Sequence, residues 1–292
     1  MKTYLKYYVL FSIALFSACE KEETPLRSLP TDNSYARYDN PSNPVDHAIY
    51  EVYQQSNIPI LYTDTISKNP LEILNLNYQL SGANTAYIYT YPKQQADILA
   101  GVTFVRDQIL PVVGKNVKVY SISLMDVLKT EIVYNPSYSV VTNYAVVNGL
   151  TTVAIANVPA IRTMNASQLK AYRAGVLAGV LVNSLATSDL LTQFYAVSNN
   201  NYGKWVYGTE DTNTSLMYKT KEEYGFFTNG TEYPTSYQIG TQIQDLTEYL
   251  NKIFSLNAQE FNAAYASYPL IMLKYNYIKG ALNKLGVDLT KI

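Results

Sequence analysis

The chain has 292 residues, with 22 Lys and Arg against 23 Asp and Glu, one Cys, one His and 29 Tyr. A net charge of −1 leaves no basic excess to neutralise phosphates, which argues against nucleic-acid binding. One Cys and one His exclude an intrachain disulfide, a Cys/His zinc cluster and an HExxH pair. The hydrophobic fraction of 48% is enough for a sizeable core, and Tyr suits half-buried surfaces and interfaces.

The N-terminus predicts a secretory signal. A basic start is followed by an apolar run over residues 7–16, too short to span a bilayer as a helix, and then by small residues. The only cysteine, Cys19, directly follows Ser17-Ala18, which resembles a bacterial lipoprotein signal. That resemblance implies removal of residues 1–18 and acylation of Cys19, whereas the alternative is a buried or free thiol.

Residues 19–44 predict a flexible tether, because their polar composition, rich in Pro, Asn, Ser and Asp, cannot bury enough apolar surface to fold. The acidic cluster over residues 20–23 resembles the export signal that sends Bacteroidota lipoproteins to the outer face of the outer membrane. The alternative is an ordinary solvated tether. We therefore expect a lipid-anchored outer-membrane protein, exposed at the cell surface, with a single folded domain over residues 45–292.

Hydrophobic periodicity predicts the elements of the first half of this domain. They are a helix from Val45 to residues 56–57, an extended segment over 58–62, a helix over 93–110 and a strand over 117–122. Two β-branched runs, residues 140–147 and 150–156, are joined by Asn148-Gly149, which is the strongest short-range cue for a hairpin.

The segment 169–185 predicts a helix that Asn165 or Ser167 can cap. It is apolar nearly all round, so we expect it to be the central buried helix. Gly175 and Gly179 share one face, where they would let another backbone approach closely. A polar loop and three helices are expected to follow, over residues 198–215, 238–254, 259–266 and 269–285, with Gly286 as the last C-cap.

This order of strands, hairpin, buried helix, long loop and helices is the layout of a zincin-type metallopeptidase. Short segments in the same order resemble the zinc-binding metallopeptidase lipoproteins of Bacteroidota, a family often encoded beside starch-utilisation-type transporter and lipoprotein pairs. The segments are 45–50, 58–62, the hairpin at 148–149, the helix from residue 169, 244–249, 274–279 and 286–289. The resemblance implies an α+β, zincin-like domain with a mixed β-sheet and hairpin, a central buried helix and a C-terminal helical part.

The catalytic helix of that family carries His-Glu-x-x-His, in which two imidazoles hold zinc and the Glu takes a proton from the bound water. The only His of this chain is His47, and its only Cys is expected to carry lipid. The matching helix has neither His nor carboxylate and offers instead Leu177, Ala178, Leu181 and Val182. We therefore predict a pseudo-metallopeptidase that is not an enzyme and that uses neither a metal nor a cofactor.

Asp245 and Glu248 match the acidic segment that lies near the metal in the family. One helical turn apart, they share a face and could act as an acid–base pair or a weak cation site; the alternative is a solvated or capping pair left when the metal site decayed. His47 is interpreted as a surface or helix-packing residue. Asp64-Thr65-Ile66 resembles the short O-glycosylation motif of Bacteroidota secreted proteins, which would place a glycan on Thr65.

Three functions remain open. The leading hypothesis is a non-catalytic surface lipoprotein that serves as a binding or scaffolding subunit of an outer-membrane complex. Its expected partners are a TonB-dependent transporter with its lid lipoprotein, or another β-barrel machine, because tyrosine-rich and charge-poor surfaces favour such contacts. The second hypothesis is a glycan- or peptide-binding lipoprotein. The third is a residual enzyme that uses Asp245 and Glu248 without zinc.

The placement of four aromatic residues discriminates between the first two hypotheses. A single cleft beside the central helix would favour binding of a glycan or peptide, whereas a flat patch of exposed tyrosines would favour docking of a partner protein. The residues of this candidate cleft are Tyr195, Tyr202, Trp205 and Tyr207.

Overall fold

The computed structural model describes residues 35–68, 71–77, 86–114, 116–135 and 137–292. Of these, Arg37–Ile292 form one compact unit. The predicted signal peptide, the acidic cluster and Cys19 lie outside the described residues. The compact unit begins before the predicted domain start at residue 45, and Asn40 Nδ2 donates to Asp46 Oδ2 at 2.9 Å. The last residues of the predicted tether therefore pack with the domain.

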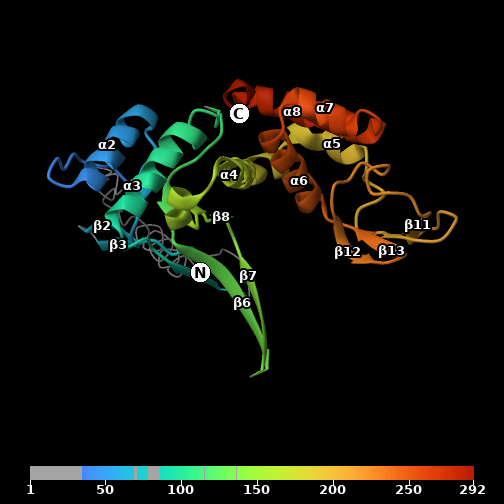
Figure 1. The fold of residues 1–292 in the computed structure, drawn as a ribbon, viewed down its shortest axis with the longest axis horizontal. Coiled ribbons are helices and arrows are strands. Elements are labelled where there is room, and N and C mark those ends of the chain that lie inside the picture. The colour runs from blue at the N-terminus through green and yellow to red at the C-terminus, as the bar shows by residue number, and fades with distance from the viewer. Residues whose placement is uncertain (1–34, 69–70, 78–85, 115, 136) are drawn as a thin grey trace, which may run out of the picture. The chain divides into compact units, whose positions relative to one another are not determined.

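Helices α2 (Pro44–Ser56) and α3 (Gln95–Phe104) lie side by side in the N-terminal part (Figure 1). Asn43 caps α2 by accepting hydrogen bonds from backbone N–H groups of its first turn, and Asn57, with φ 56°, ends it in the left-handed region. Helix α3 continues as a π-helical turn, η1 (Val105–Ile109). Both predicted helices are confirmed.

A four-stranded sheet has the order β1-β5-β9-β8, with β1, β5 and β9 parallel and β8 antiparallel to β9. Gly149 N–H donates to the Thr152 carbonyl at 2.8 Å, so β8 and β9 form the predicted hairpin. The strands are short: β1 (Ile60–Leu61), β5 (Ile122–Leu124), β8 (Val146–Asn148) and β9 (Val153–Ile155).

The strand predicted over 117–122 is wrong except at its end. The β1–β5 ladder begins where Ile60 pairs with Ile122, and the preceding Pro59 has no N–H with which to extend it. The strand predicted over 140–147 is divided, because residues up to Asn143 pair with β6 and residues from Val146 pair with β9.

Strands β4 (Tyr87–Thr90), β6 (Val127–Asn135) and β7 (Tyr138–Asn143) form an antiparallel sheet in that order. β4 pairs only with residues 127–130 of β6, so the rest of β6 extends beyond β4 with β7 as a two-stranded hairpin. In Figure 1 this β6–β7 hairpin projects away from the neighbouring elements. A separate antiparallel pair consists of β2 (Thr65–Lys68) and β3 (Leu71–Ile73).

After a 3₁₀ turn, η2 (Val158–Thr163), helix α4 (Ala166–Ala186) runs through the main core. Asn165 and Gln168 form a reciprocal capping box at its start. Buried side chains occur along most of its length, so the predicted central buried helix is confirmed.

The close approach predicted for two glycines of α4 holds for one of them. A Cβ added at Gly179 would lie 2.6 Å from Val146 Cβ of β8, which is closer than real Cβ contacts. A Cβ added at Gly175 would meet only Asn251 Oδ1, at 3.9 Å. Gly179 therefore allows β8 to pack against the helix, and Gly175 does not serve this purpose.

Beyond η3 (Asp189–Leu191) and α5 (Thr192–Ala196), another four-stranded sheet has the order β11-β10-β13-β12, and we call it the second sheet. Its strands are β10 (Trp205–Val206), β11 (Ser215–Leu216), β12 (Asn229–Tyr233) and β13 (Ser236–Ile239). This sheet has a small core of its own, which consists of Val206, Leu216, Tyr224, Phe226, Tyr237 and Ile239. The predicted polar loop over 198–215 therefore contains β10 and leads into β11.

Three helices and a 3₁₀ turn complete the chain: α6 (Gln242–Ser255), α7 (Ala258–Tyr265), α8 (Pro269–Lys284) and η4 (Leu289–Lys291). The helix predicted to start at residue 238 starts later, because β13 ends at Ile239 and Thr241 caps α6. Gly286, with φ 74°, follows α8 as predicted.

The fold is mixed α+β, as predicted, and the zincin-like assignment within that class stays a prediction. Among the described residues, no single helix is long and apolar enough to cross a membrane. Together, the segments Ala166–Ala186 and Asp189–Ala196 are long and apolar enough to cross a membrane, but they are bent by 99° relative to each other. Most apolar side chains of α4 are buried in the core.

Candidate functional site

Asp245 lies in the first turn of α6 and forms an ion pair with Lys274 of α8. Lys274 Nζ donates to Asp245 Oδ2 at 2.6 Å, to the Gly225 carbonyl at 3.0 Å and to Ser198 Oγ at 3.4 Å. The side chains of Lys274 and Asp245 are 0% and 1% exposed. Lysine is rarely buried completely, so the sequence indicates no role for Lys274 beyond its place in a predicted helix and in the family-matching segment 274–279.

Four aromatic rings surround the ammonium group and form what we call the aromatic cage. Their centroids lie 4.3 to 5.9 Å from Lys274 Nζ, a distance suited to cation–π attraction. The Tyr202 hydroxyl also donates to Asp245 Oδ2 at 2.5 Å. The cage consists of Phe194 of α5, Tyr202, Phe226 and Tyr249 of α6. Because Phe226 also belongs to the core of the second sheet, the cage connects that sheet to the C-terminal helices.

Burial shifts both members of the ion pair toward their neutral forms. Desolvation raises the pKa of Asp245, against the opposing effects of Lys274 and Tyr202. Desolvation likewise lowers the pKa of Lys274 to about 8, although Asp245 favours its charged form. Within the described residues, Asp245 Oδ1 is a buried oxygen without a hydrogen-bond partner, as is the Tyr195 hydroxyl. An unpartnered buried acceptor costs about 1–3 kcal/mol, so the ion pair is incompletely satisfied.

The two predicted acidic residues occupy different environments. Asp245 is buried and forms an ion pair with Lys274. Glu248 is half-buried, and its burial raises its pKa, although the charge of Lys252 acts in the opposite direction. Among the described residues, no group of three His, Cys, Asp or Glu side chains could hold a metal ion. An acid–base role for the pair would require Asp245 to reach substrate, and its carboxylate is sealed from solvent by Lys274 and the aromatic cage.

The four residues of the candidate aromatic cleft divide into two groups. The rings of Tyr195 and Tyr202 meet edge to face at 6.5 Å, and Tyr202 is held by Asp245. Trp205 instead stacks on Tyr233 of β12 at 5.7 Å, and Tyr207 is exposed after β10. Two of the four therefore belong to the surroundings of the ion pair and two to the second sheet.

The predicted positions on α4 lie in or beside the main core. Leu177, Ala178 and Leu181 are fully buried in the main core, and Val182 is half-buried beside it. Cys19 lies outside the described residues.

Two further residues lie near the surface. His47 lies at the surface of α2, with Nδ1 2.7 Å from Asp39 Oδ1 and Nε2 3.6 Å from Glu51 Oε1. Thr65 begins β2, and its Oγ1 donates to Asp64 Oδ1 at 3.2 Å. The surface reading of His47 agrees with these contacts, and glycosylation of Thr65 stays a prediction.

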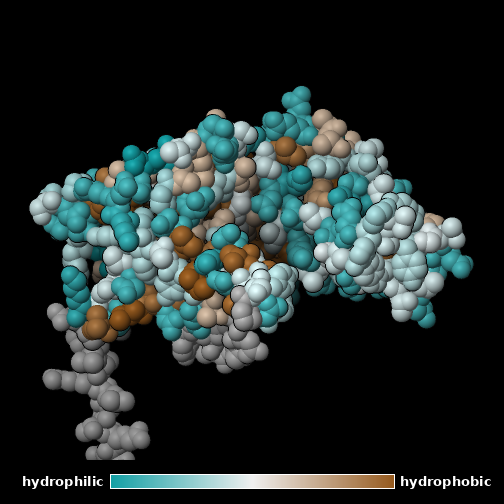
Figure 2. Space-filling view, turned by 60° about the horizontal axis from the view of Figure 1, so that its bottom comes forward, coloured by the Kyte–Doolittle hydropathy of each residue, from teal (hydrophilic) through white to brown (hydrophobic). Residues whose placement is uncertain are grey.

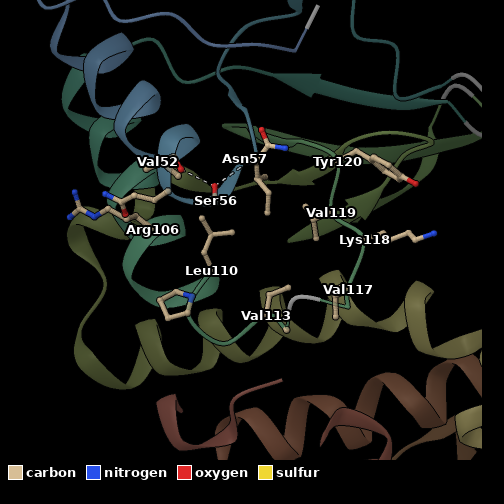
Figure 3. A pocket seen from close by; sticks show the side chains of 14 residues that line it. Val52, Ser56, Asn57, Arg106, Leu110, Val113, Val117, Lys118, Val119 and Tyr120 are labelled. Atoms are coloured by element: carbon tan, nitrogen blue, oxygen red, sulfur yellow. Dashed lines mark hydrogen bonds between the residues drawn. The ribbon is translucent and has the colours of Figure 1, made fainter. Parts of the chain in front are cut away.

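A cavity of about 630 Å³ lies between the end of α2, the turn after η1 and residues 117–120 (Figure 3). Its floor is apolar, with Val52, Leu110 and Val113 among the residues that line it, and Lys118 and Tyr120 stand at its edge. The volume falls in the range of small-molecule sites. None of the described residues that line it is a candidate site residue of the sequence analysis.

More exposed large apolar residues lie on the β6–β7 hairpin than on any other strand pair described above. Its rings Tyr134 and Tyr138 are 63% and 56% exposed and stack on each other at 5.5 Å. Strand β7 has no charged residue, and among the described residues it forms an edge of its sheet. Figure 2, in which the lower side of Figure 1 comes forward, shows hydrophobic residues gathered on that side. The other exposed apolar residues of the hairpin include Ile132, Val133, Val140 and Val141.

Each face of the hairpin carries exposed apolar side chains, and on the face of Val133 they stand beside the polar Ser139 and Glu131. Cross-strand partners point to the same face, so Ile132 with Val140 marks one face, and Val133 with Ser139 marks the other. Sequence reasoning missed β6 and therefore this hairpin, although the sequence between the two strands begins with Asn-Pro, a recognised turn dipeptide.

Comparisons with protein-family models, with curated proteins and with solved structures return no match for this chain.

Proposed function

We propose that the protein is a non-catalytic binding subunit that docks on a partner protein through the β6–β7 hairpin. The observation that carries this proposal is an uncharged edge strand, β7, whose hairpin exposes apolar side chains and two stacked tyrosines. Soluble proteins normally protect such edges with charges or proline, because unpaired backbone groups invite another strand. The free N–H and C=O groups of β7 suit addition to the sheet edge of a partner.

A protein partner fits these features better than a glycan in an aromatic cleft. Tyr202 is engaged by Asp245, and Trp205 stacks on Tyr233, so these rings are occupied within the protein. The exposed tyrosines of the hairpin offer large contact area with little loss of rotamer freedom. Exposed tyrosines outside a cleft support docking of a partner protein over binding of a glycan.

The proposed setting is the outer face of the outer membrane. The lipoprotein signal at Cys19 and the acidic residues after it support this location, and the lack of His in the matching helix supports a pseudo-metallopeptidase. We propose a β-barrel protein, such as a TonB-dependent transporter with its lid lipoprotein, or another lipoprotein as the partner class.

The test is purification of the full-length protein from native outer membranes in mild detergent, followed by identification of co-purifying proteins. The informative variant is Val140→Lys/Val141→Lys, which places one charge on each face of β7. The matched control is Leu71→Lys/Ile73→Lys, which changes two exposed apolar residues of another edge strand, β3.

We expect a barrel protein or lipoprotein to co-purify with the wild type and with the β3 control, and to be lost from the β7 variant. Circular dichroism should show that both variants remain folded. Migration of the wild type as a free monomer, or equal recovery of the partner with the β7 variant, would contradict the proposal.

A further inference from the structure

The polar groups of the buried ion pair are unequally satisfied. Lys274 Nζ has two close acceptors, Asp245 Oδ2 and the Gly225 carbonyl, and its third contact, to Ser198 Oγ, is long at 3.4 Å. Asp245 Oδ2 accepts from both Lys274 and Tyr202, while Oδ1 has no partner among the described residues. A carboxylate with one buried oxygen unpartnered is a poor resting state in a dry interior.

The surroundings favour transfer of a proton within the pair. The aromatic cage and complete burial keep bulk water away from both groups. In such an environment an amine and a carboxylic acid are favoured over their ions, because desolvation penalises the charged forms. Transfer of one proton from the ammonium to the carboxylate produces a nucleophilic amine in contact with a carboxylic acid.

We infer that Lys274 and Asp245 condense to an isopeptide bond between Lys274 Nζ and Asp245 Cγ. After the proton transfer, the amine nitrogen attacks Cγ, and the Tyr202 hydroxyl hydrogen-bonds the oxygen that gains negative charge. The Cγ–Oδ1 bond then breaks, and Oδ1 leaves as water with two of the three protons of the original ammonium. The third proton stays on the amide nitrogen, so no oxidant, reductant or further reactant is needed.

The amide product leaves fewer buried polar atoms without a hydrogen-bond partner than the ion pair does. The amide N–H keeps the Gly225 carbonyl as its acceptor, and Oδ2 keeps the hydrogen bond from Tyr202. The atom that leaves is Oδ1, the one without a partner. Because both groups are already held in contact, the reaction has the advantage of a preorganised intramolecular step.

The bond is tested by tryptic digestion of the full-length protein and mass spectrometry. Trypsin should release residues 222–252, with Asp245, and residues 253–274 as separate peptides if no bond forms. With the bond, Lys274 resists cleavage, and 222–252 is joined to 253–279 in one branched peptide whose mass is that of both parts less one water. Recovery of the separate peptides from the wild type would overturn the inference.

Two variants locate the bond. Asp245→Ala should abolish the branched peptide and restore cleavage after Lys274. Asp245→Asn should still give a branched peptide of the same mass as the wild type, because the side-chain amide loses ammonia where the acid loses water. This second variant keeps the test valid if Asp245→Ala fails to fold, and a branched peptide that persists in Asp245→Ala would contradict the assignment.

An internal control is present in the same digest. Lys170 Nζ lies 3.7 Å from Glu260 Oε2, but both side chains are 47% exposed. Water keeps this pair ionised, so no peptide that contains Lys170 should be attached to residues 253–279. Attachment of such a peptide would show that lysine–carboxylate contacts cross-link without regard to burial, and it would overturn the argument from the dry site.

Discussion

Lys274 shows how one residue can tie several elements of a fold together. Its amine contacts Asp245 of α6, the Gly225 carbonyl of the segment before β12 and a ring of α5. These segments are distant in sequence, and their packing depends on the same buried group. Removing the group leaves the Asp245 carboxyl buried without its partner and also prevents the Lys274–Asp245 bond inferred above, which is the costly way to break a buried pair.

The variant Lys274→Met is therefore expected to lower the free energy of unfolding by about 3–5 kcal/mol. The double variant Lys274→Met/Asp245→Leu should lose less, because it removes the stranded carboxylate together with its partner. Urea denaturation followed by circular dichroism measures both. If the double variant had a lower free energy of unfolding than Lys274→Met, the buried carboxyl would not be the cause of the loss.

His47 gives a pH-dependent contribution at the surface. Its hydrogen bond to Asp39 raises its pKa above 6.5, with a further favourable charge effect from Glu51. A raised folded-state pKa means that the protonated form stabilises the fold below the unfolded-state pKa, and that this stabilisation is lost as pH rises through the folded-state value.

An NMR titration of the imidazole should accordingly show a pKa above 6.5 in the wild type and a lower value in Asp39→Asn. Asn40→Ala, which alters the neighbouring residue, should leave the His47 pKa close to that of the wild type. Equal pKa values in the wild type and Asp39→Asn would remove Asp39 as the cause.

At the scale of elements, α4 depends on how closely β8 can approach it. Gly179→Ala should destabilise the protein by about 1–3 kcal/mol, because the new Cβ would overlap Val146. Gly175→Ala is the matched control, since its nearest neighbour is 3.9 Å away; it should raise stability by up to about 1 kcal/mol through helix propensity. Thermal denaturation of the two variants should show shifts of opposite sign.

Helices were the part of the fold that could be predicted from sequence. The capping residue Asn165 and apolar periodicity are local signals that tertiary structure did not override, whereas the start of α6 was placed too early because its cap, Thr241, was not recognised. Strand boundaries were harder, because they depend on which partner each strand meets. The run around residues 140–147 is rich in β-branched residues, and the positions of β6 and β9 decide where it divides.

The candidate sites were harder still to predict. Asp245 was singled out, but its partner Lys274 comes from a helix whose register against α6 no local pattern encodes. The β6–β7 hairpin lacks the Asn-Gly cue that identified the β8–β9 hairpin, and its exposed valines look like those of a buried strand in the sequence. Exposure is a property of the assembled fold, so the surface proposed for docking could not be recognised from the sequence.

At the scale of the whole molecule, the tyrosine excess has two distinct uses. Buried tyrosines such as Tyr249 and Tyr237 place their rings in a core and donate a hydrogen bond to a backbone carbonyl. Exposed tyrosines such as Tyr134 and Tyr138 have no such role within the protein. The same residue type therefore supports the interior of the second sheet and provides contact area at the proposed docking surface.

The proposed attachment to the membrane depends on the thiol of Cys19. We expect Cys19→Ser to abolish incorporation of a labelled fatty acid and to release the protein from the membrane fraction into the soluble one. Ser17→Thr, a change beside the cysteine, should retain the label. Retention of the label in Cys19→Ser would refute the lipid anchor.

The composition of the β6–β7 hairpin also determines how proteases can cut it. No Lys or Arg occurs between Lys129 and Arg162, so trypsin has no site in the outer part of the hairpin, whereas Tyr134 and Tyr138 present chymotrypsin with exposed aromatic residues close to the turn. Brief chymotrypsin treatment should therefore nick the free protein at its tip while trypsin leaves the tip intact. A bound partner would shield the tip from chymotrypsin. The fraction of protein that chymotrypsin nicks there would therefore measure how much of it is bound to a partner, without a label.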